Sequence, residues 1–195
     1  GLVTEVSKKN SIEKYLFRNI TKLYFIEILK LGLKKIFFIC TEKIFRNFKI
    51  FFSVKSVIKK FDIKYFEIKN DINKEEYINK IIDIKPDLII SSCSLIFKNR
   101  ILDIPFYGCI NRHSSLLPSF GGVYPVFHSI AKGNNIFGVT VHCMTSKIDD
   151  GKILSQEKIL ISEKNLSKIY KECFSKSANL VIEGVNNLLN NKFLK

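Results

Sequence analysis

The spacing of hydrophobic residues changes near residue 62. Before that point, apolar residues recur at helical spacing, and Ser53 to Phe61 is a second, shorter run of the same kind. The first series consists of Leu23, Ile26, Leu29, Leu33 and Phe37. Only Gly1 and Gly32 of the nine glycines precede residue 108. We therefore predict that residues 1–60 form a helical N-terminal segment rich in lysine and aromatic residues, and that residues 61–195 form the core of the protein.

From residue 62 onward, short strand patterns alternate with helical ones. Residues 63–68 predict a strand, and Asn73 with Glu76 three positions later predicts a capping box at the start of a helix. Pro86 is expected to end this helix. Residues 88–90 are a continuous apolar run, which is typical of a strand buried on both faces of a parallel sheet.

The second half of the chain continues the alternation. Strands are expected at residues 106–110, 138–144 and 153–161, and a short helix at residues 124–131. A long closing helix carries an apolar stripe of Leu166, Ile169, Tyr170, Cys173, Phe174, Ala178, Val181, Ile182, Val185, Leu188 and Leu189. This order of elements predicts an α/β fold, with a mostly parallel, Rossmann-like sheet flanked by helices.

Composition and charge narrow the class of protein. A hydrophobic content of 46% and an aromatic content of 12% exclude a disordered chain. The net charge of +14 admits binding to nucleic acid or to an acidic membrane, but the lysines are scattered and favour a solvated basic surface. The five cysteines form no CxxC pair, which argues against a disulfide scaffold or a zinc site. No apolar run approaches the roughly 18–20 residues of a membrane span, so we expect a cytoplasmic protein. We also expect no bound metal, because the cysteines lack the spacing of a zinc site.

Candidate chemistry gathers after two of the expected strands. Asn111 and His113 follow the strand at 106–110, and Asp149 follows the strand at 138–144. Ligands of open α/β sheets bind outside the carboxyl ends of the strands, so these residues are expected to converge. An amide can donate to an oxyanion, an imidazole can move a proton, and a carboxylate can orient that imidazole. Of the remaining histidines, His142 and His128 are expected to be structural.

Several motifs occur in an order that resembles the 10-formyltetrahydrofolate-dependent formyltransferases. These motifs are Asn111-Arg112-His113, a Ser-Leu-Leu-Pro loop at 115–118, a Gly-Val-Thr strand at 138–140 and Ile148-Asp149-Asp150-Gly151. The resemblance is specific from about residue 60 to 161 and implies a formyltransferase fold. The usual first strand and its ligand loop are not found, so we expect the chain to lack that strand. Residues 1–3 would then be the second strand, and residues 1–60 a remnant of the first half of the domain with an insertion.

The resemblance also implies the roles of individual residues. The catalytic residues would be Asn111, His113 and Asp149, and the co-substrate would be 10-formyltetrahydrofolate as the formyl donor. Two loops would line the folate pocket, through Cys93, Ser94, Leu95, Ile96, Phe97, Thr145, Ile148 and Asp150. Formyl transfer passes through a tetrahedral carbon with a negatively charged oxygen, which Asn111 and His113 could stabilise. Whether His113 acts as a base or as a cationic electrophile stays open at this stage.

The formyl acceptor would be a primary amine, and the sequence helps to separate three kinds of acceptor. We favour a nucleotide-linked amino sugar. A methionyl-tRNA formyltransferase carries a C-terminal β-barrel, for which too few residues follow Ile161. A glycinamide ribonucleotide formyltransferase has a Gly- and Ser-rich phosphate loop and an acidic-His-x-x-Tyr-Pro pattern, neither of which is visible here. The alternative of another class is a non-catalytic basic module that binds nucleic acid or a membrane surface through residues 22–52. We expect no specific nucleic-acid partner, and a homodimer is compatible with the sequence.

Overall fold

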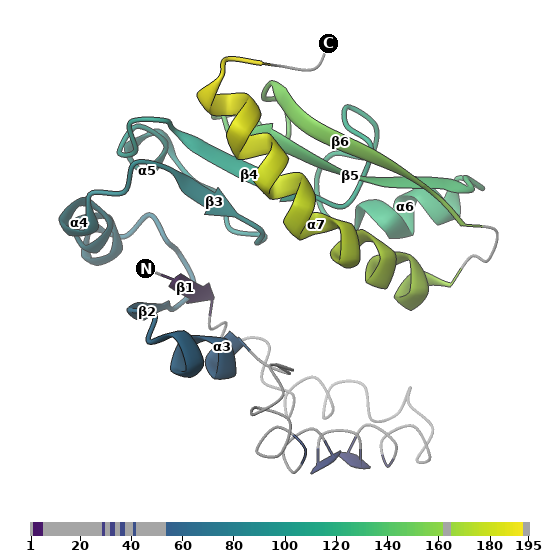
Figure 1. The fold of residues 1–195 in the computed structure, drawn as a ribbon, viewed down its shortest axis with the longest axis horizontal. Coiled ribbons are helices and arrows are strands. Elements are labelled where there is room, and N and C mark those ends of the chain that lie inside the picture. The colour runs from purple at the N-terminus through teal and green to yellow at the C-terminus, as the bar shows by residue number, and fades with distance from the viewer. Residues whose placement is uncertain are drawn as a thin grey trace. The chain divides into compact units, whose positions relative to one another are not determined.

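The computed structural model describes residues 2–5, 29, 32–33, 36–37, 41, 54–161 and 165–192. These residues belong to two compact units, residues 1–71 and 72–195 (Figure 1). In the first unit, β1 (Leu2–Glu5) pairs in parallel with β2 (Tyr65–Ile68). The helix α3 (Val54–Phe61) precedes β2, as the helical run at 53–61 predicted. Of the helical series predicted at 23–37, Leu29, Leu33 and Phe37 are helical and exposed, whereas Leu23 and Ile26 lie outside the described residues.

The second unit contains a four-stranded sheet in the order β3-β4-β5-β6. Its strands are β3 (Ile89–Ser91), β4 (Cys109–His113), β5 (Ile136–Cys143) and β6 (Ile153–Leu160). The α/β class is confirmed, but the prediction of a mostly parallel sheet is wrong for this unit. Only β3 and β4 are parallel, and β5 is antiparallel to both β4 and β6. A short connection without a helix joins β5 to β6, and neighbouring strands joined in this way run antiparallel.

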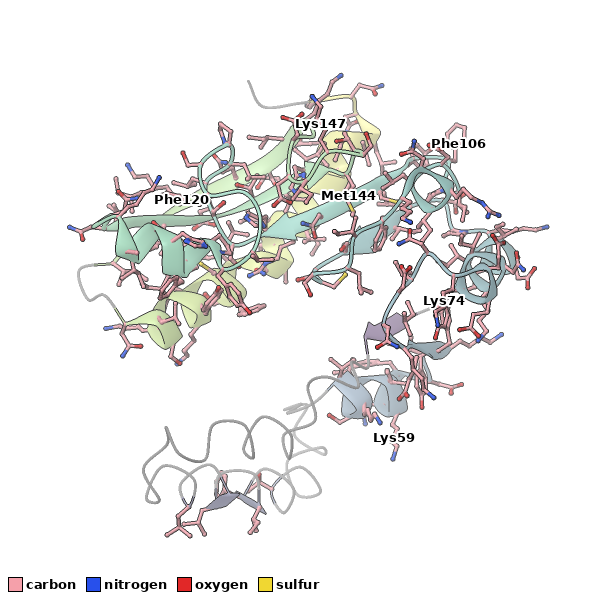
Figure 2. The ribbon with its side chains drawn as sticks, turned by 180° about the vertical axis from the view of Figure 1, so that it is seen from behind. Lys59, Lys74, Phe106, Phe120, Met144 and Lys147 are labelled. Atoms are coloured by element: carbon pink, nitrogen blue, oxygen red, sulfur yellow. The ribbon has the colours of Figure 1, made fainter. Side chains whose placement is uncertain are left out.

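Two predicted strands are shifted or less buried than expected. The strand predicted at 106–110 lies at 109–113, so that Asn111 is in the middle of β4 and not at its end. Phe106 is 84% exposed in the preceding turn, at the outer edge of the unit (Figure 2). The expectation that residues 88–90 are buried on both faces is also wrong. Ile90, on the terminal strand β3 of this sheet, is 52% exposed.

The helix α4 (Glu75–Ile84) begins without the predicted capping box. Its N-cap residue is Lys74, which makes no side-chain cap hydrogen bond. The side chain of Asn73 instead donates to the carbonyl of Ile96 at 2.9 Å and accepts from the backbone N–H of Lys98 at 2.8 Å. It therefore anchors the loop that leads from β3 into α5 (Asn99–Leu102). Pro86 disfavours helical backbone at the residue before it, and α4 ends two residues earlier, as predicted.

Two further helices complete the second unit: α6 (Pro125–Ala131) and α7 (Leu166–Leu189). Figure 1 shows α7 crossing one face of the sheet over β5 and β6, where the main core lies. This core includes Ile110, Val139, Val141, Leu154, Ile169, Cys173 and Leu180, all at most 4% exposed. Burial of such side chains stabilises the fold by roughly 1.5–3 kcal/mol each. The stripe predicted on α7 is wrong at five positions, which are exposed: Leu166, Phe174, Ala178, Ile182 and Leu189.

Gly184 sets the distance between α7 and the sheet. A Cβ atom there would lie 2.9 Å from Val141 Cγ1 and 3.2 Å from Ser155 Oγ. Ser155 in turn donates to the carbonyl of Leu180 at 2.7 Å. No helix among the described residues is long and apolar enough to cross a membrane.

A charged side chain lies beneath α7. Arg112 is 8% exposed, its Nε donates to Ser177 Oγ at 2.7 Å, and its guanidinium carbon lies 4.3 Å from the centre of the Phe174 ring. One of its terminal nitrogens, Nη2, is buried without a hydrogen-bond partner. Burial lowers the pKa of the Arg112 guanidinium. A buried, incompletely paired charge is costly, so Arg112 does not owe its place to stability.

We therefore predict that Arg112→Met leaves stability unchanged or raises it by about 1 kcal/mol, because an apolar side chain of similar length removes the unpaired donor. Urea unfolding of both proteins measures this. The control is Arg100→Met, which removes an exposed arginine paired with Glu75 and should leave the free energy of unfolding nearly unchanged. A clear loss of stability in Arg112→Met alone would contradict the prediction.

Candidate active site

The pairing of β4 with β5 places polar side chains next to one another. Asn111 lies opposite His142, and His113 lies opposite Thr140. On the other side of β4, Ser91 of β3 lies opposite Asn111. Side chains alternate between the two faces of a strand, so Asn111 and His113 share one face, whereas Arg112 points to the face covered by α7. The Asn-x-His spacing is thus what a strand needs to place an amide and an imidazole side by side.

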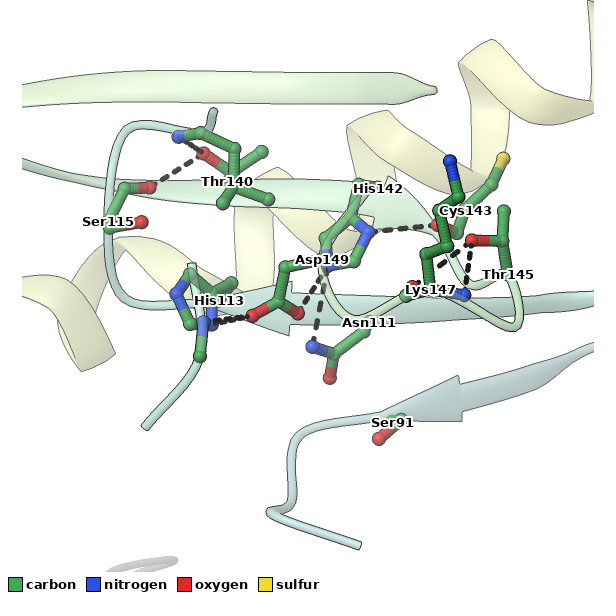
Figure 3. Close-up of polar contacts among 12 residues, drawn as sticks. Ser91, Asn111, His113, Ser115, Thr140, His142, Cys143, Thr145, Lys147 and Asp149 are labelled. Carbon is green, nitrogen blue, oxygen red and sulfur yellow. Dashed lines mark hydrogen bonds and ion pairs between the residues drawn. The ribbon is translucent and has the colours of Figure 1, made fainter. Parts of the chain in front are cut away.

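Asp149 reaches this face from the loop that joins β5 to β6. Its carboxylate Oδ2 lies 3.6 Å from His113 Nδ1, and its Oδ1 lies 3.4 Å from His142 Nε2. The amide nitrogen of Asn111 lies 3.4 Å from the same Nε2. Figure 3 shows the four side chains converging from β4, β5 and the loop. The structure therefore brings together all three residues predicted to be catalytic.

The route by which Asp149 arrives differs from the one expected. Because β5 is antiparallel to β4, the end of β5 lies beside Ile110, away from His113. The carboxyl ends of β4 and β5 thus do not meet at one edge, and the loop folds back over the sheet face. Gly151 makes this possible, since a Cβ atom there would lie 1.8 Å from the Cys143 carbonyl oxygen. The backbone N–H of Gly122 donates to Asp149 Oδ2 at 2.7 Å and fixes the carboxylate.

His113 faces a hydrogen-bond acceptor at each ring nitrogen. Nε2 lies 3.0 Å from the carbonyl of Phe120, which can only accept, so Nε2 carries a proton. Nδ1 faces the carboxylate of Asp149. The Phe120 carbonyl and the Asp149 carboxylate therefore hold the His113 ring from its two nitrogens.

His142 is the member of the site that sequence reasoning missed, because it was expected to be structural. Its side chain is 2% exposed, and its Nδ1 donates to the Cys143 carbonyl at 2.8 Å. Burial lowers the pKa of His142, although the Cys143 carbonyl and Asp149 act in the opposite direction. The ring is thus neutral at pH 7, and its Nε2 accepts from the amide of Asn111. Its approach to Asp149 is then not an ion pair. Only the register of β4 and β5 reveals this role.

Comparison with known proteins shows the family of the chain. The model of the family described as formyl transferase matches residues 35–184. The chain belongs to the formyl transferase family. This match begins within the segment at 1–60, where the sequence alone showed little resemblance.

Curated relatives of the chain are longer than it is. The bifunctional polymyxin resistance protein ArnA of Wigglesworthia glossinidia brevipalpis is 39% identical over 85% of this chain and 26% of its own length. A methionyl-tRNA formyltransferase of Bacillus thuringiensis subsp. konkukian is 36% identical over 67% of this chain and 44% of its own length. The chain thus spans less than half of the curated relatives it matches here.

Solved structures show the same fold at lower identity. A phosphoribosylglycinamide formyltransferase from Anaplasma phagocytophilum superimposes with a TM-score of 0.62 and 22% identity, over 69% of this chain and 68% of that one. The formyltransferase PseJ from Anoxybacillus kamchatkensis has a TM-score of 0.55 and 23% identity, over 72% and 73% of the two chains. The predicted formyltransferase fold is confirmed.

Two motifs of the formyl transferase family pack against each other beside the site. Thr140 Oγ1 donates to the Ser115 carbonyl at 2.6 Å and accepts from the backbone N–H of Leu117 at 3.1 Å. Gly138 has no room for a Cβ atom, which would lie 2.3 Å from Leu116 Cδ2. The Gly-Val-Thr strand therefore holds the Ser-Leu-Leu-Pro loop that follows His113. A cavity of about 180 Å³ lies under this loop and α6, too small for a folate or a nucleotide-linked sugar.

The residues predicted to bind folate lie on two exposed loops, and their role stays a prediction. The first loop follows β3, with Cys93, Ser94 and Ile96 exposed, Leu95 half-buried and Phe97 buried at 7%. The second follows β5, with Thr145, Ile148 and Asp150 exposed. There the hydroxyl of Thr145 bonds to the backbone of Lys147, whose Nζ lies 3.6 Å from Asp150 Oδ2. No group of three metal-ligating side chains occurs among the described residues.

Gly151→Ala should destabilise the protein by roughly 1–3 kcal/mol or more, because the added methyl group collides with the backbone at Cys143 and must displace the loop of Asp149. Urea unfolding measures the loss. Gly121→Ala is the matched control, because a Cβ atom there has its nearest contact at an ordinary 3.5 Å. Equal stability of the two variants would contradict the role given to Gly151.

The lowered pKa of His142 predicts a pH dependence of stability. Below its ordinary value of 6.5, the unfolded chain protonates His142 before the folded chain does. The free energy of unfolding should therefore fall as the pH decreases from 6.5 toward the folded-state pKa. Above pH 6.5, the stabilisation from neutral His142 is fully present. His142→Gln should reduce the fall, whereas His128→Gln, at an exposed position, should not. Thermal unfolding at several pH values measures both, and identical slopes in the two variants would contradict the prediction.

Proposed function

We propose that this chain transfers a formyl group from 10-formyltetrahydrofolate to a primary amine. The observation that carries the proposal is the convergence of Asn111, His113 and Asp149 on one face of the sheet, with 3.6 Å between His113 and Asp149. Membership of the formyl transferase family supports the reaction class. The solved structure of PseJ supports the donor, because that protein is in complex with tetrahydrofolate.

The reaction needs three things from the protein. The amine nitrogen attacks the formyl carbon, a new C–N bond forms, and the carbonyl electron pair moves to oxygen. The C–N bond to the folate nitrogen then breaks, the oxygen re-forms the carbonyl, and the proton lost by the amine passes to the folate nitrogen. Asn111 and His113 stabilise the oxyanion by donating N–H groups. Asp149 orients the His113 ring and accepts the amine proton through water.

Of the two candidate roles of His113, its contacts support donation to the formyl oxygen. Nε2 lies 3.0 Å from the Phe120 carbonyl, which can only accept, so this nitrogen carries the N–H that would donate to the oxyanion. Asp149 Oδ2, 3.6 Å from Nδ1, would orient the ring. The Phe120 carbonyl must share or release Nε2 when the substrate arrives.

The two exposed loops described above would hold the folate. Each carries an exposed isoleucine: Ile96 is 62% exposed and Ile148 is 65% exposed. Apolar side chains of this kind suit the faces of a pteridine ring, and backbone groups of residues 93–97 and 145–150 would bond its edge.

The acceptor that we favour is the amine of a nucleotide-linked sugar. The solved structure of PseJ is a complex with a UDP-linked formamido sugar. The net charge of +14 would favour the phosphates of such an acceptor. Other relatives are named for phosphoribosylglycinamide or methionyl-tRNA, and these amines are the alternatives.

A thermal-shift assay with a stable folate analogue, followed by formyl transfer to a panel of nucleotide-linked amino sugars, tests the proposal. Asn111→Ala and His113→Ala should each lower the rate by roughly 10²–10³-fold, because each removes a donor to the oxyanion. The shift induced by the folate analogue should survive in both. His128→Ala serves as the control. A wild-type rate in His113→Ala would remove His113 from the mechanism.

A non-catalytic basic module gives the opposite pattern. It would show no folate-induced shift, and its binding to polyanions would fall steeply with salt concentration. That outcome would overturn the proposed reaction.

A further inference from the structure

The oxygen of the Asn111 side chain has no partner. Asn111 is 9% exposed, and its Oδ1 atom is buried without a hydrogen bond. A buried acceptor without a partner is costly and calls for an explanation. In Figure 3 this oxygen lies on the side of the carboxamide turned away from His142. The unpaired Oδ1 of Asn111 therefore faces away from the His142 ring, which holds the amide nitrogen.

His142 determines which end of the carboxamide is left open. Its Nδ1 donates to the Cys143 carbonyl, so the neutral ring presents a lone pair at Nε2. A lone pair can bond the amide nitrogen of Asn111 but not its oxygen, which fixes the orientation of a group that could otherwise rotate by 180°. The other charged or titratable groups beside His142 are Asp149 of the loop and His113 of β4. One N–H of the Asn111 amide then donates to His142 Nε2, and the second N–H lies on the same edge of the carboxamide as Oδ1.

The open edge of the carboxamide matches the tetrahedral adduct of the proposed reaction. This edge carries a carbonyl oxygen and an N–H, separated by one carbon. The adduct carries an N–H from the attacking amine and a negative oxygen, likewise separated by one carbon. Two hydrogen bonds can close a ring between them, as between two paired amides. The charged oxygen makes the N–H···O⁻ bond the stronger of the two.

We propose that His142 is a positioning residue that turns Asn111 so that its carboxamide pairs with both the amine N–H and the oxyanion of the adduct. This inference rests on the proposed function and deepens it. Asn111 is then not only an oxyanion donor, because its oxygen also holds and orients the incoming amine. If His142 had only a structural role, the orientation of the Asn111 carboxamide would not depend on it.

A pair of variants separates positioning from structure. Glutamine at residue 142 places a carboxamide oxygen near the site of Nε2 and keeps an acceptor for Asn111. Asparagine is shorter, keeps a donor for the Cys143 carbonyl and loses the group that faces Asn111. His142→Gln should retain kcat within a few-fold, whereas His142→Asn should lower kcat by about 100-fold at a nearly unchanged KM for the folate. His128→Gln is the control for loss of a histidine.

The side-chain amide of Asn111 gives a readout that needs no substrate. Its ¹⁵N–¹H resonances can be assigned by their absence in Asn111→Asp. Near pH 7.5 the two amide protons should be widely separated in wild type and in His142→Gln, because one bonds to residue 142. The separation should collapse in His142→Asn. Identical amide resonances in wild type and His142→Asn would overturn the inference.

The two readouts distinguish the two proposals. If wild type transfers formyl and His142→Asn does so with equal kcat, the inference is overturned and the proposed function stands. If the amide resonances respond as expected but wild type formylates no amine, the proposed function is overturned, and with it the pairing to the adduct. Loss of kcat in His142→Asn with retention in His142→Gln supports both.

Discussion

The antiparallel register between β4 and β5 is the constraint on which the site depends. It sets Asn111 against His142 and His113 against Thr140 on the face of the sheet not covered by α7. Side chains alternate along a strand, so a slip by one residue would exchange the two faces of β4. Arg112 would then point toward Asp149, while Asn111 and His113 would enter the apolar core. The register is held by the core residues of the opposite face, including Ile110, Val139 and Val141.

The second constraint is the fold-back of the loop between β5 and β6. The loop starts at the far end of β5, yet Asp149 must reach His113, and the close contact of Gly151 with the Cys143 backbone allows the turn. A single hydrogen bond from Gly122 then ties the carboxylate to the loop after β4. The backbone carbonyl of Phe120, from the same loop, holds the other side of His113. Two loops that are distant in sequence thus orient one carboxylate and one imidazole.

Each face of the sheet carries buried polar groups with and without hydrogen-bond partners. Thr140 and Ser155 have complete hydrogen bonds, whereas Asn111 Oδ1 and Arg112 Nη2 do not. The two unpaired atoms have different explanations. Asn111 lies among groups able to act on a substrate, so we assign its unpaired oxygen to substrate binding. Arg112 lies under Phe174 and Ser177, where its unpaired nitrogen is expected to cost stability.

The sequence alone determined the family, the α/β class and the three residues that gather at the site, because these depend on local patterns and on motifs of fixed spacing. It also placed α3, α6, α7 and the last two strands within a few residues. It did not determine strand direction, the position of Asn111 within β4, or the N-cap of α4. These depend on which segments pair, and pairing is decided by burial over the whole unit. His142 shows the difference most clearly. Along the chain it is one histidine among apolar residues, and only the register of two strands 31 residues apart brings it to Asn111.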